Sequence, residues 1–396
     1  MEDFQQYSRF STDVIHTGQQ AEQWNSLAVV PPITTATTYK LTDPSEVKGF
    51  LYSRLDNPTR SCLETCLAAA EGAKHALCFS SGLASIVTAT HLLKAGDHLL
   101  CIDDVYGGTN KYFNHCATRF GVEVSMVDLT NMDNVKENIK SNTSMVWIET
   151  PTNPTLKLVD ISAVVDVVRS KCEDAIVVVD NTFMSPCFQR PLTLGADVVM
   201  YSVTKYINGH TDVIMGALVC NSDEIFERLK FLQTYLGAIP SPFDCYLANR
   251  GLKTLSVRMK EHMKNGLLVA QHLEKHPAVE RVLHPGLPSH PQYELGKRQM
   301  IGYSGMCVFF IKGGLKEAAA FVNSLKIFTL AVSLGGYESL VELPSKLTHA
   351  PLTQTERDHL GITDNMIRVS VGLENAEDLI NDLDQALNAV FNKSSQ

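Results

Sequence analysis

Residues 175–205, AIVVVDNTFMSPCFQRPLTLGADVVMYSVTK, contain the pattern that decides the fold. The apolar run 175–179 ends in Asp180, and the apolar run 198–201 ends in a polar stretch that includes Lys205. An apolar run bounded by polar turn residues is typical of a strand buried on both faces of a parallel sheet. We therefore expect two buried strands whose polar ends lie at the ligand-binding edge of a sheet.

The same alternation of apolar strands and helices extends outward from this stretch. A helix is expected from the cap Asn57 and the first-turn Pro58 to Gly72, and the next helix, LASIVTATHLLKAG, is expected to close at Gly96. Further strands are expected at HALCFS, HLLCIDD, VEVSMVD, SMVWIET and DVIMGALVC. Strands that alternate with helices predict an α/β fold in which helices flank a mostly parallel sheet.

The pattern changes after about Gly251, where a long amphipathic stretch is followed by a loop, the strand MCVFFIKG and two further helices. We interpret residues 256–396 as a smaller C-terminal α+β domain and residues 56–255 as the large domain. Residues 1–55 lack regular periodicity and include VVPPITTATTYK. We expect them to form an extended arm that contacts a neighbouring subunit.

The composition favours small-molecule chemistry. The chain has 396 residues with 34 Lys+Arg and 43 Asp+Glu, a net charge of −9, so the basic excess of a nucleic-acid-binding protein is missing. Hydrophobic residues at 44% and charged residues at 19% are typical of a folded chain rather than a disordered one. A globular enzyme is the simplest expectation.

The positions of the cysteines and the lack of long apolar runs indicate whether the chain binds a structural metal and in which cellular compartment it works. Most of the ten cysteines lie inside apolar runs, and no CxxC or HxxxH spacing completes a ligand set, so we expect neither disulfides nor a metal site. The N-terminal residues lack the apolar segment of a secretory signal, and no run reaches the ~18 apolar residues of a membrane span. We expect a cytoplasmic protein with no membrane or nucleic-acid partner.

Lys205 follows an apolar strand within SVTKYINGH, close to the hydroxyls of Ser202 and Thr204. A lysine that leaves an apolar strand can be desolvated, which lowers the pKa of its amine and allows a Schiff base to form. The two hydroxyls can donate hydrogen bonds to a phosphate. Taken alone, a solvated lysine at a strand end is the more common explanation of such a position.

Asp180 ends the apolar run AIVVVD, where a side chain faces the ligand crevice of a parallel sheet. A carboxylate at such a place can pair with the pyridine nitrogen of pyridoxal phosphate and keep the ring able to accept electrons. An aspartate that caps a turn or helix is an equal alternative. Together, Lys205 and Asp180 favour pyridoxal phosphate as cofactor.

Three further positions suit the same ligand. Gly82 and Leu83 open a helix whose free N–H groups can bind a phosphate, and the sequence there matches neither GxGxxG nor GxxxxGK[ST]. Tyr106 can stack on an aromatic ring, and Arg368 can bind a carboxylate through two hydrogen bonds. A turn tyrosine and a surface arginine remain the plainer alternatives for these last two residues.

Several motifs together resemble those of one family. The motifs YSRLDNPTR, FSSGLAS, ETPTNPT, VVVDNTF, SVTKYINGH and LAVSLGGYESL, in this order and spacing, are similar to those of the Cys/Met-metabolism family of pyridoxal-phosphate enzymes over nearly the whole chain. The resemblance implies the aspartate aminotransferase-like fold, fold type I of the pyridoxal-phosphate-dependent transferases. It also implies a homotetramer built as a dimer of dimers.

The resemblance implies a role for each motif residue. Lys205 would hold the cofactor and later move protons, Asp180 would pair with the pyridine nitrogen, and Thr182 would support Asp180. Tyr106 would stack on the cofactor ring and assist proton transfer. The implied phosphate-binding residues are Gly82, Leu83, Ser202 and Thr204, with Tyr52 and Arg54 from a neighbouring chain, and the implied residues for the substrate α-carboxylate are Arg368, Asn153 and Ser333.

The segments PSPFDCYLANRGLKTLSVRM, DVYGGTNKYF and HPGLPSHPQ are similar to those of eukaryotic family members that cleave cystathionine. The implied reaction is an α,γ-elimination of L-cystathionine to L-cysteine, ammonia and 2-oxobutanoate, with hydrogen sulfide from cysteine or homocysteine as a side product. Elimination from methionine and synthesis of cystathionine are the alternatives within the family. A cofactor-free binding protein and a nucleotide-binding oxidoreductase are the alternatives outside it.

Two positions depart from the family pattern in the substrate pocket. Leu51 and Val332 stand where vertebrate relatives usually carry acids, so we expect a more apolar wall around the far end of the substrate. Lys111 remains as a partner for a distal carboxylate. We therefore expect cystathionine to stay the preferred substrate and methionine to be rejected less strongly than in a relative with both acids.

Overall fold

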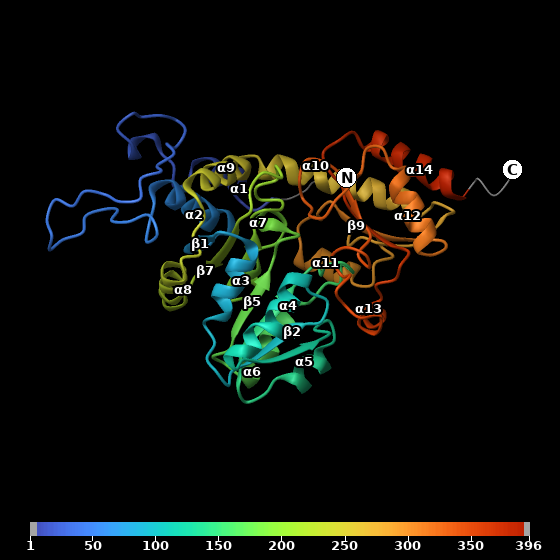
Figure 1. Ribbon diagram of the computed structural model, residues 1–396, viewed down its shortest axis with the longest axis horizontal. Helices are drawn as coiled ribbons and strands as arrows, with labels where there is room; N and C mark the ends of the chain where they lie inside the picture. The colour runs from blue at the N-terminus through green and yellow to red at the C-terminus, as the bar shows by residue number, and fades with distance from the viewer. Residues whose placement is uncertain (1–5, 392–396) are drawn as a thin grey trace.

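The structure is a computed structural model that describes residues 6–391. The outer ends of the predicted arm and of the predicted C-terminal domain therefore lie outside the described residues. Two separate β-sheets organise the chain, and the part of the N-terminal arm that directly precedes the first long helix projects away from both of them (Figure 1).

The larger sheet has seven strands in the order β1-β7-β6-β5-β4-β2-β3. The five strands from β6 to β3 run parallel, whereas β7 is antiparallel to both β6 and β1. This arrangement confirms the expected mostly parallel sheet. The strands are His75–Phe79 (β1), His98–Ile102 (β2), Glu123–Val127 (β3), Thr143–Glu149 (β4), Ile176–Asp180 (β5), Val198–Ser202 (β6) and Gly216–Cys220 (β7).

Helices pack on both faces of this sheet, and the caps expected from the sequence are present. Asn57 accepts hydrogen bonds from the N–H groups of Thr59 and Arg60, and Gly72 ends the helix with a positive φ of 72°. The helices of this part of the chain are Pro58–Glu71 (α2), Gly82–Thr90 (α3), Gly107–His115 (α4), Ala117–Phe120 (η2), Met132–Asn138 (α5), Ile161–Lys171 (α6), Ser185–Phe188 (α7), Pro191–Leu194 (η3), Asp223–Leu236 (α8) and Pro242–Lys253 (α9).

One helix boundary differs from the prediction. The helix α3 ends at Thr90 rather than at Gly96. The N–H groups of Leu92 and Leu93 each donate to a carbonyl three residues earlier, at 3.0 Å, so the chain tightens into turns. Gly96, with φ 89°, lies in the turn before β2 instead of at the helix end.

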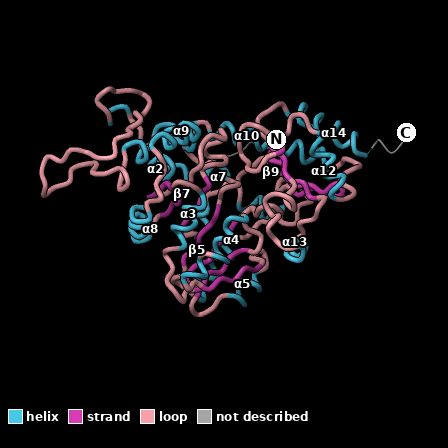
Figure 2. Tube along the Cα trace, viewed as in Figure 1, coloured by secondary structure: helices cyan, strands magenta, loops and turns pink. Residues whose placement is uncertain are grey.

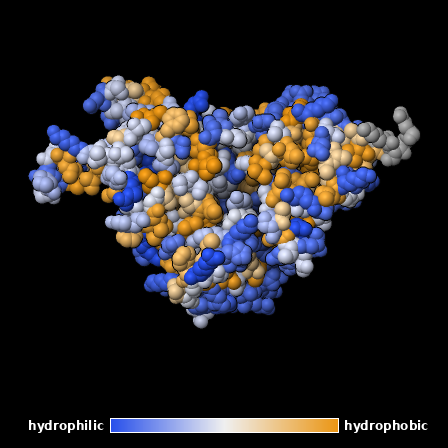
Figure 3. Space-filling view, in the orientation of Figure 1, coloured by the Kyte–Doolittle hydropathy of each residue, from blue (hydrophilic) through white to orange (hydrophobic). Residues whose placement is uncertain are grey.

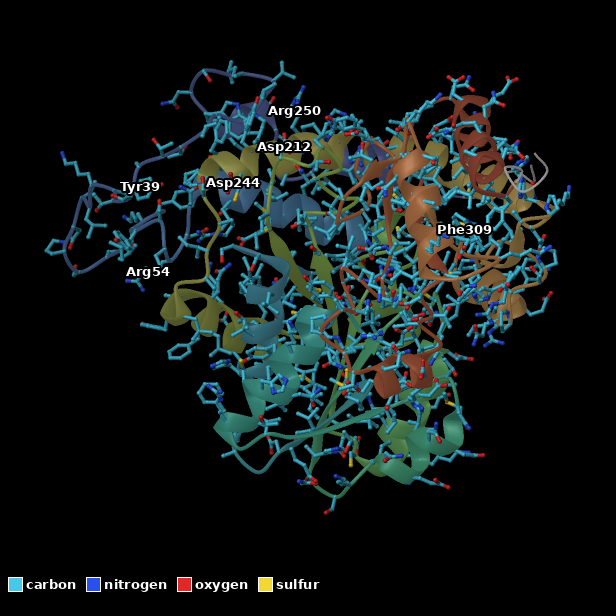
Figure 4. All side chains as sticks on the ribbon, turned by 45° about the vertical axis from the view of Figure 1, so that its right-hand side comes forward. Tyr39, Arg54, Asp212, Asp244, Arg250 and Phe309 are labelled. Atoms are coloured by element: carbon cyan, nitrogen blue, oxygen red, sulfur yellow. The ribbon has the colours of Figure 1, made fainter. Side chains whose placement is uncertain are left out.

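The smaller sheet has five strands in the order β10-β11-β12-β9-β8 and follows the 19-residue helix Leu255–Leu273 (α10). Phe309 of β9 and Phe321 of α12 are fully buried in its core, with ring centroids 5.8 Å apart, and Figure 4 shows Phe309 within this part of the molecule. Its other elements are Val279–Leu283 (β8), Tyr293–Gln299 (α11), Met306–Ile311 (β9), Leu315–Ser324 (α12), Thr329–Leu330 (β10), Leu340–Glu342 (β11), Gln354–Leu360 (α13), Met366–Ser370 (β12) and Ala376–Phe391 (α14). No helix within residues 6–391 is both long and apolar enough to cross a membrane.

The N-terminal arm is only partly extended. Residues Phe10–His16 form a short helix (α1), because Phe10 and Val14 lie four residues apart and are both buried against the body. A single turn follows at Ala21–Gln23 (η1), and the chain from there to α2 is mostly loop that projects from the body (Figure 2). Apolar side chains lie exposed on this projection (Figure 3), with Val29 88% exposed.

Candidate active site

A cavity of about 300 Å³ lies at the carboxyl ends of the parallel strands. Glu149, Asp180 and Ser202 are the last residues of β4, β5 and β6, and all three line the cavity. Arg368 of β12 reaches the same cavity from the smaller sheet. Both sheets therefore contribute to one site at the edge where parallel α/β sheets bind their ligands.

The cavity gathers most of the residues predicted from the sequence. Those that line it are Gly82, Leu83, Tyr106, Asn153, Asp180, Thr182, Ser202, Thr204, Lys205, Val332, Ser333 and Arg368. Lys111 instead lines an adjoining cavity of about 340 Å³, which shares Thr348 with the first. Leu51, Tyr52 and Arg54 lie on the arm and line neither cavity.

Lys205 follows β6 in a tight turn, in which its N–H donates to the carbonyl of Ser202 at 3.1 Å. Its Nζ donates to the Ser333 hydroxyl at 2.7 Å. Burial and the charge of Arg368, partly opposed by the charge of Glu342, together lower the pKa of the Lys205 amine to about 8. A substantial fraction of the amine is therefore neutral near physiological pH, which suits a nucleophile and a base.

Asp180 and Glu149 form a pair of buried carboxyl groups at the sheet edge. They lie opposite each other in the register of β4 and β5 and are 6% and 4% exposed. Burial raises the pKa of Asp180 to about 6, although hydrogen bonds from Thr182 lower it. Burial and the Asp180 charge raise the pKa of Glu149 well above its usual value. Within this coupled pair the protonated form is favoured more strongly for Glu149 than for Asp180.

Thr182 contacts both Asp180 and the end of β6. Its N–H donates to Asp180 Oδ1 at 3.0 Å, and its hydroxyl accepts the N–H of Ser202 at 2.8 Å. One residue thus connects the end of β5 to the end of β6. These contacts hold the Asp180 carboxylate in place beside the loop that carries Lys205.

Glu149 is a site residue that the sequence reasoning missed. Its Oε2 accepts the N–H of Tyr106 at 3.0 Å, so it fixes the start of α4, where Tyr106 stands. The signal was present, because the apolar run of β4 ends in an acid just as the run of β5 ends in Asp180. The rule that singled out Asp180 applies equally to Glu149.

The start of α3 forms a cradle for an anion. Ser81 caps this nine-residue helix, and a Cβ added at Gly82 would lie only 3.1 Å from the Ser202 hydroxyl oxygen. Glycine therefore lets the helix N-terminus and this hydroxyl approach each other, which suits a phosphate group. The Thr204 hydroxyl lies nearby but already donates to the Met215 carbonyl at 3.1 Å.

Arg368 is buried with three acceptors around its guanidinium. Nη1 donates to Asn153 Oδ1 at 2.8 Å and lies 2.9 Å from Glu342 Oε1, and Nη2 donates to the Ser333 carbonyl at 3.0 Å. Ser333 has φ 94°, a backbone conformation that costs energy for a residue other than glycine. The contacts from Arg368 and Lys205 hold Ser333 in this strained conformation.

Apolar side chains form one wall of the cavity. Val332 lines it and is 57% exposed, and Ile214 and Leu83 lie on the same cavity surface. The Tyr106 ring lies over Gly108, where an added Cβ would come within 2.5 Å of it. The Lys205 amine, the Asp180 carboxylate, the anion cradle and the exposed Tyr106 ring together fit pyridoxal phosphate.

The raised pKa of Asp180 predicts how the stability of the ligand-free protein depends on pH. Folding raises the pKa of Asp180 from its ordinary value of 3.8 to about 6, so the folded protein holds this proton more tightly than the unfolded chain. The resulting stabilisation is fully present below about pH 3.8 and is lost as the pH rises through about 6. Asn cannot ionise, so we expect Asp180→Asn to avoid this loss. The difference in free energy of unfolding between the variant and wild type should be about 1 to 3 kcal/mol more favourable to the variant at about pH 6.5 than at about pH 4. Urea unfolding at both pH values measures this difference.

The exposed Asp133 provides the control for this measurement. We expect Asp133→Asn, a change on the surface of α5, to leave the pH dependence of unfolding as in wild type. An Asp180→Asn variant whose stability relative to wild type is the same at both pH values would contradict the assigned burial of this carboxylate.

Comparisons with known proteins agree with this geometry. Residues 11–388 match the family described as Cys/Met metabolism PLP-dependent enzyme. The cystathionine gamma-lyases of Bos taurus and Homo sapiens are each 58% identical to this chain over 383 residues, which cover 97% of this chain and 94% of each relative. The cystathionine gamma-lyase of Dictyostelium discoideum is 56% identical over 380 residues, with 96% and 97% covered.

Two solved structures share the whole architecture. The metB protein of Corynebacterium glutamicum superposes with a TM-score of 0.92 at 43% identity and covers 96% of this chain and 98% of its own. The cystathionine gamma-lyase of Lactobacillus plantarum, solved with L-serine, gives a TM-score of 0.92 at 36% identity, with 96% and 99% covered. The predicted family is confirmed, and the chain belongs to the Cys/Met-metabolism family of pyridoxal-phosphate-dependent enzymes.

Proposed function

We propose that this chain is a carbon–sulfur lyase that cleaves L-cystathionine by α,γ-elimination. The observation that carries the proposal is one cavity in which the Lys205 amine, with a lowered pKa, lies beside the guanidinium of Arg368 and the buried carboxylate of Asp180. A base, a carboxylate-binding group and a partner for a cofactor ring are what elimination from an amino acid requires. Relatives that share 55–58% of their residues with this chain carry the name cystathionine gamma-lyase.

Each cavity residue has an assignment toward the cofactor. Lys205 would hold it covalently, Asp180 would pair with the ring nitrogen, and the α3 N-terminus with Ser202 would bind the phosphate, joined by Thr204 if its hydroxyl turns away from the Met215 carbonyl. The Tyr106 ring would stack on the cofactor ring. When bound, pyridoxal phosphate withdraws electrons from the substrate Cα and so makes the Cα proton acidic.

The remaining work falls to the side chains of the cavity. Arg368 and Asn153 bind the α-carboxylate and orient the substrate, and Ser333 lies between that carboxylate and the Lys205 amine. The neutral Lys205 amine takes the Cα proton, releases it to water, and then takes the second proton from Cβ. The Tyr106 phenol serves as the acid that protonates the departing sulfur. Cystathionine and water thereby yield L-cysteine, ammonia and 2-oxobutanoate.

Removal of the lysine tests the assignment most directly. We expect Lys205→Ala to lose at least about a hundredfold in turnover and to keep wild-type secondary structure. Borohydride reduction of the wild-type holoenzyme, followed by peptide mapping, should place the pyridoxyl group on Lys205. Lys253→Ala, which changes a lysine of α9 outside the cavity, should keep the activity. A label on another lysine, or full activity without Lys205, would refute the assignment.

We further propose that the apolar wall at Val332 weakens discrimination against methionine. A thioether methyl can lie against Val332 without leaving a carboxylate buried and unpaired, whereas Lys111 in the adjoining cavity attracts the charged end of cystathionine. Hydrogen sulfide release from cysteine or homocysteine would use the same residues.

Val332→Glu should widen the preference for cystathionine over methionine. We expect the ratio of the two kcat/KM values to rise by roughly tenfold, which lies within the 1 to 3 kcal/mol typical of such pocket changes. The control Val332→Gln introduces a side chain of nearly the same size as Glu but without its charge, so it should change the ratio less than Val332→Glu does. An unchanged ratio in Val332→Glu would mean that this wall is not selective. A wild type that prefers methionine would favour methionine γ-elimination instead.

We propose that the enzyme is a cytoplasmic homotetramer, a dimer of dimers in which the arm of one chain completes the site of its neighbour. Arg54 on the arm donates to the Thr234 carbonyl of its own chain at 3.0 Å, and Figure 4 shows it apart from both sheets. The exposed apolar residues of the arm support burial against another chain. The ten free cysteines support a reducing compartment.

Mixed subunits test whether the site is shared. Neither Lys205→Ala nor Arg54→Ala alone should be active, because each homodimer lacks one essential group in both sites. After subunit exchange, one site of each hybrid dimer receives both wild-type groups, so part of the activity should return. Absence of recovery, with exchange proven by native mass spectrometry, would indicate that each chain builds its own site.

A further inference from the structure

Glu342 is a buried charge beside the cavity for which the proposed reaction has no role. It ends β11 and lies directly opposite Arg368 of β12 in the register of the smaller sheet. The residue is 1% exposed, and its Oε1 lies 2.9 Å from Arg368 Nη1. The hydroxyl of Thr348, which lines the cavity, donates to the same oxygen at 2.8 Å.

We propose that Glu342 is a positioning residue: it fixes the Arg368 guanidinium for the substrate α-carboxylate and balances the charge of Arg368 beside Lys205. The proposal rests on the proposed function, because it specifies how that same site recognises an amino-acid substrate.

The sheet itself provides the positioning. A side chain on a neighbouring strand keeps its place through the strand register, so the Glu342 carboxylate holds one edge of the guanidinium with or without a substrate. The other contacts of Arg368 go to Asn153 and to the Ser333 carbonyl, which both line the cavity. A guanidinium fixed in orientation binds a carboxylate through two hydrogen bonds without first ordering a flexible side chain.

The charge of Glu342 acts on Lys205 as well. Burial lowers the pKa of the Lys205 amine most, Arg368 lowers it as well, and Glu342 raises it, so the carboxylate of Glu342 opposes the effect of Arg368 on the amine. The other titratable groups around this ion pair and the cavity, within the described residues, are Asp180, Glu149, Tyr106 and Tyr206, with His349 next to Thr348. All of these stay in place when only Glu342 is changed.

A purely structural ion pair is the alternative, and the chain offers a matched control for it. Arg60 and Glu64 of α2 form another buried pair, with Arg60 Nε 3.5 Å from Glu64 Oε1. Neither residue lines the cavity. Glu64→Gln should therefore affect the stability of the fold without changing how Lys205 titrates.

The first experiment measures Lys205 in cofactor-free protein. Trace acetylation with acetic anhydride over a range of pH, followed by mass spectrometry of the Lys205 peptide, reports the titration of this one amine. We expect Glu342→Gln to shift it downward by roughly one pH unit, and Glu64→Gln to leave it as in wild type. An unshifted Lys205 in a folded Glu342→Gln protein would overturn the charge-balancing role.

The second experiment separates position from charge. Glu342→Asp keeps the carboxylate but shortens its reach toward Arg368. We expect KM for L-cystathionine to rise roughly tenfold with kcat little changed and Lys205 titrating as in wild type. An unchanged KM in Glu342→Asp would overturn the positioning role. This test does not depend on whether Glu342→Gln folds. The acetylation measurement needs neither cofactor nor substrate, so it tests the role of Glu342 independently of the reaction. A wild-type protein that is inactive on cystathionine would contradict the proposed function but not the effect of Glu342 on Lys205.

Discussion

The site depends on one constraint: charged groups taken out of water must be paired or neutralised. Two pairs at the cavity obey it in different ways. Arg368 and Glu342 form a buried ion pair 2.9 Å apart, whereas burial and the neighbouring Asp180 raise the pKa of Glu149 and so favour its protonated form. Asp180 is left as the group of its pair that ionises more readily. It therefore suits a cationic ring nitrogen, which would replace the missing counter-charge.

The parallel sheet places these groups together. The side chains at the ends of β4, β5 and β6 meet at one edge, so Glu149, Asp180 and Ser202 reach the same cavity although they are far apart in the sequence. The smaller sheet closes the cavity from the other side with Arg368. A substrate carboxylate on Arg368 and a cofactor ring on Asp180 therefore span the space in which Lys205 acts, and the Ser333 hydroxyl holds the Lys205 amine there.

The sequence alone predicted the site residues that follow from local patterns, but not those that depend on how distant strands pair. Apolar runs that end in Asp180 or near Lys205 follow directly from the geometry of buried strands, and these strands and their edge are present. Glu342 could not be predicted in this way, because its partner depends on the antiparallel register between β11 and β12. The helix α1 was missed for a similar reason, since only tertiary packing of Phe10 and Val14 stabilises so short a helix. The early end of α3 reflects local turns that compete with helical periodicity.

In the proposed reaction, the arm and the apolar wall at Val332 would contact the end of the substrate that lies farthest from Lys205. Val332 lines the cavity within this chain, whereas Leu51 belongs to the arm, lines neither of the two cavities, and in the proposed oligomer would approach the cavity of a neighbouring subunit. Lys111 stands apart from both, in the adjoining cavity. In the proposed assembly, recognition of the distal end of a substrate would be divided among residues near the larger sheet, the smaller sheet and the arm, while Arg368 would bind the α-carboxylate within one chain. Substrate choice can therefore change through Leu51 or Val332 without altering the residues that carry out the elimination.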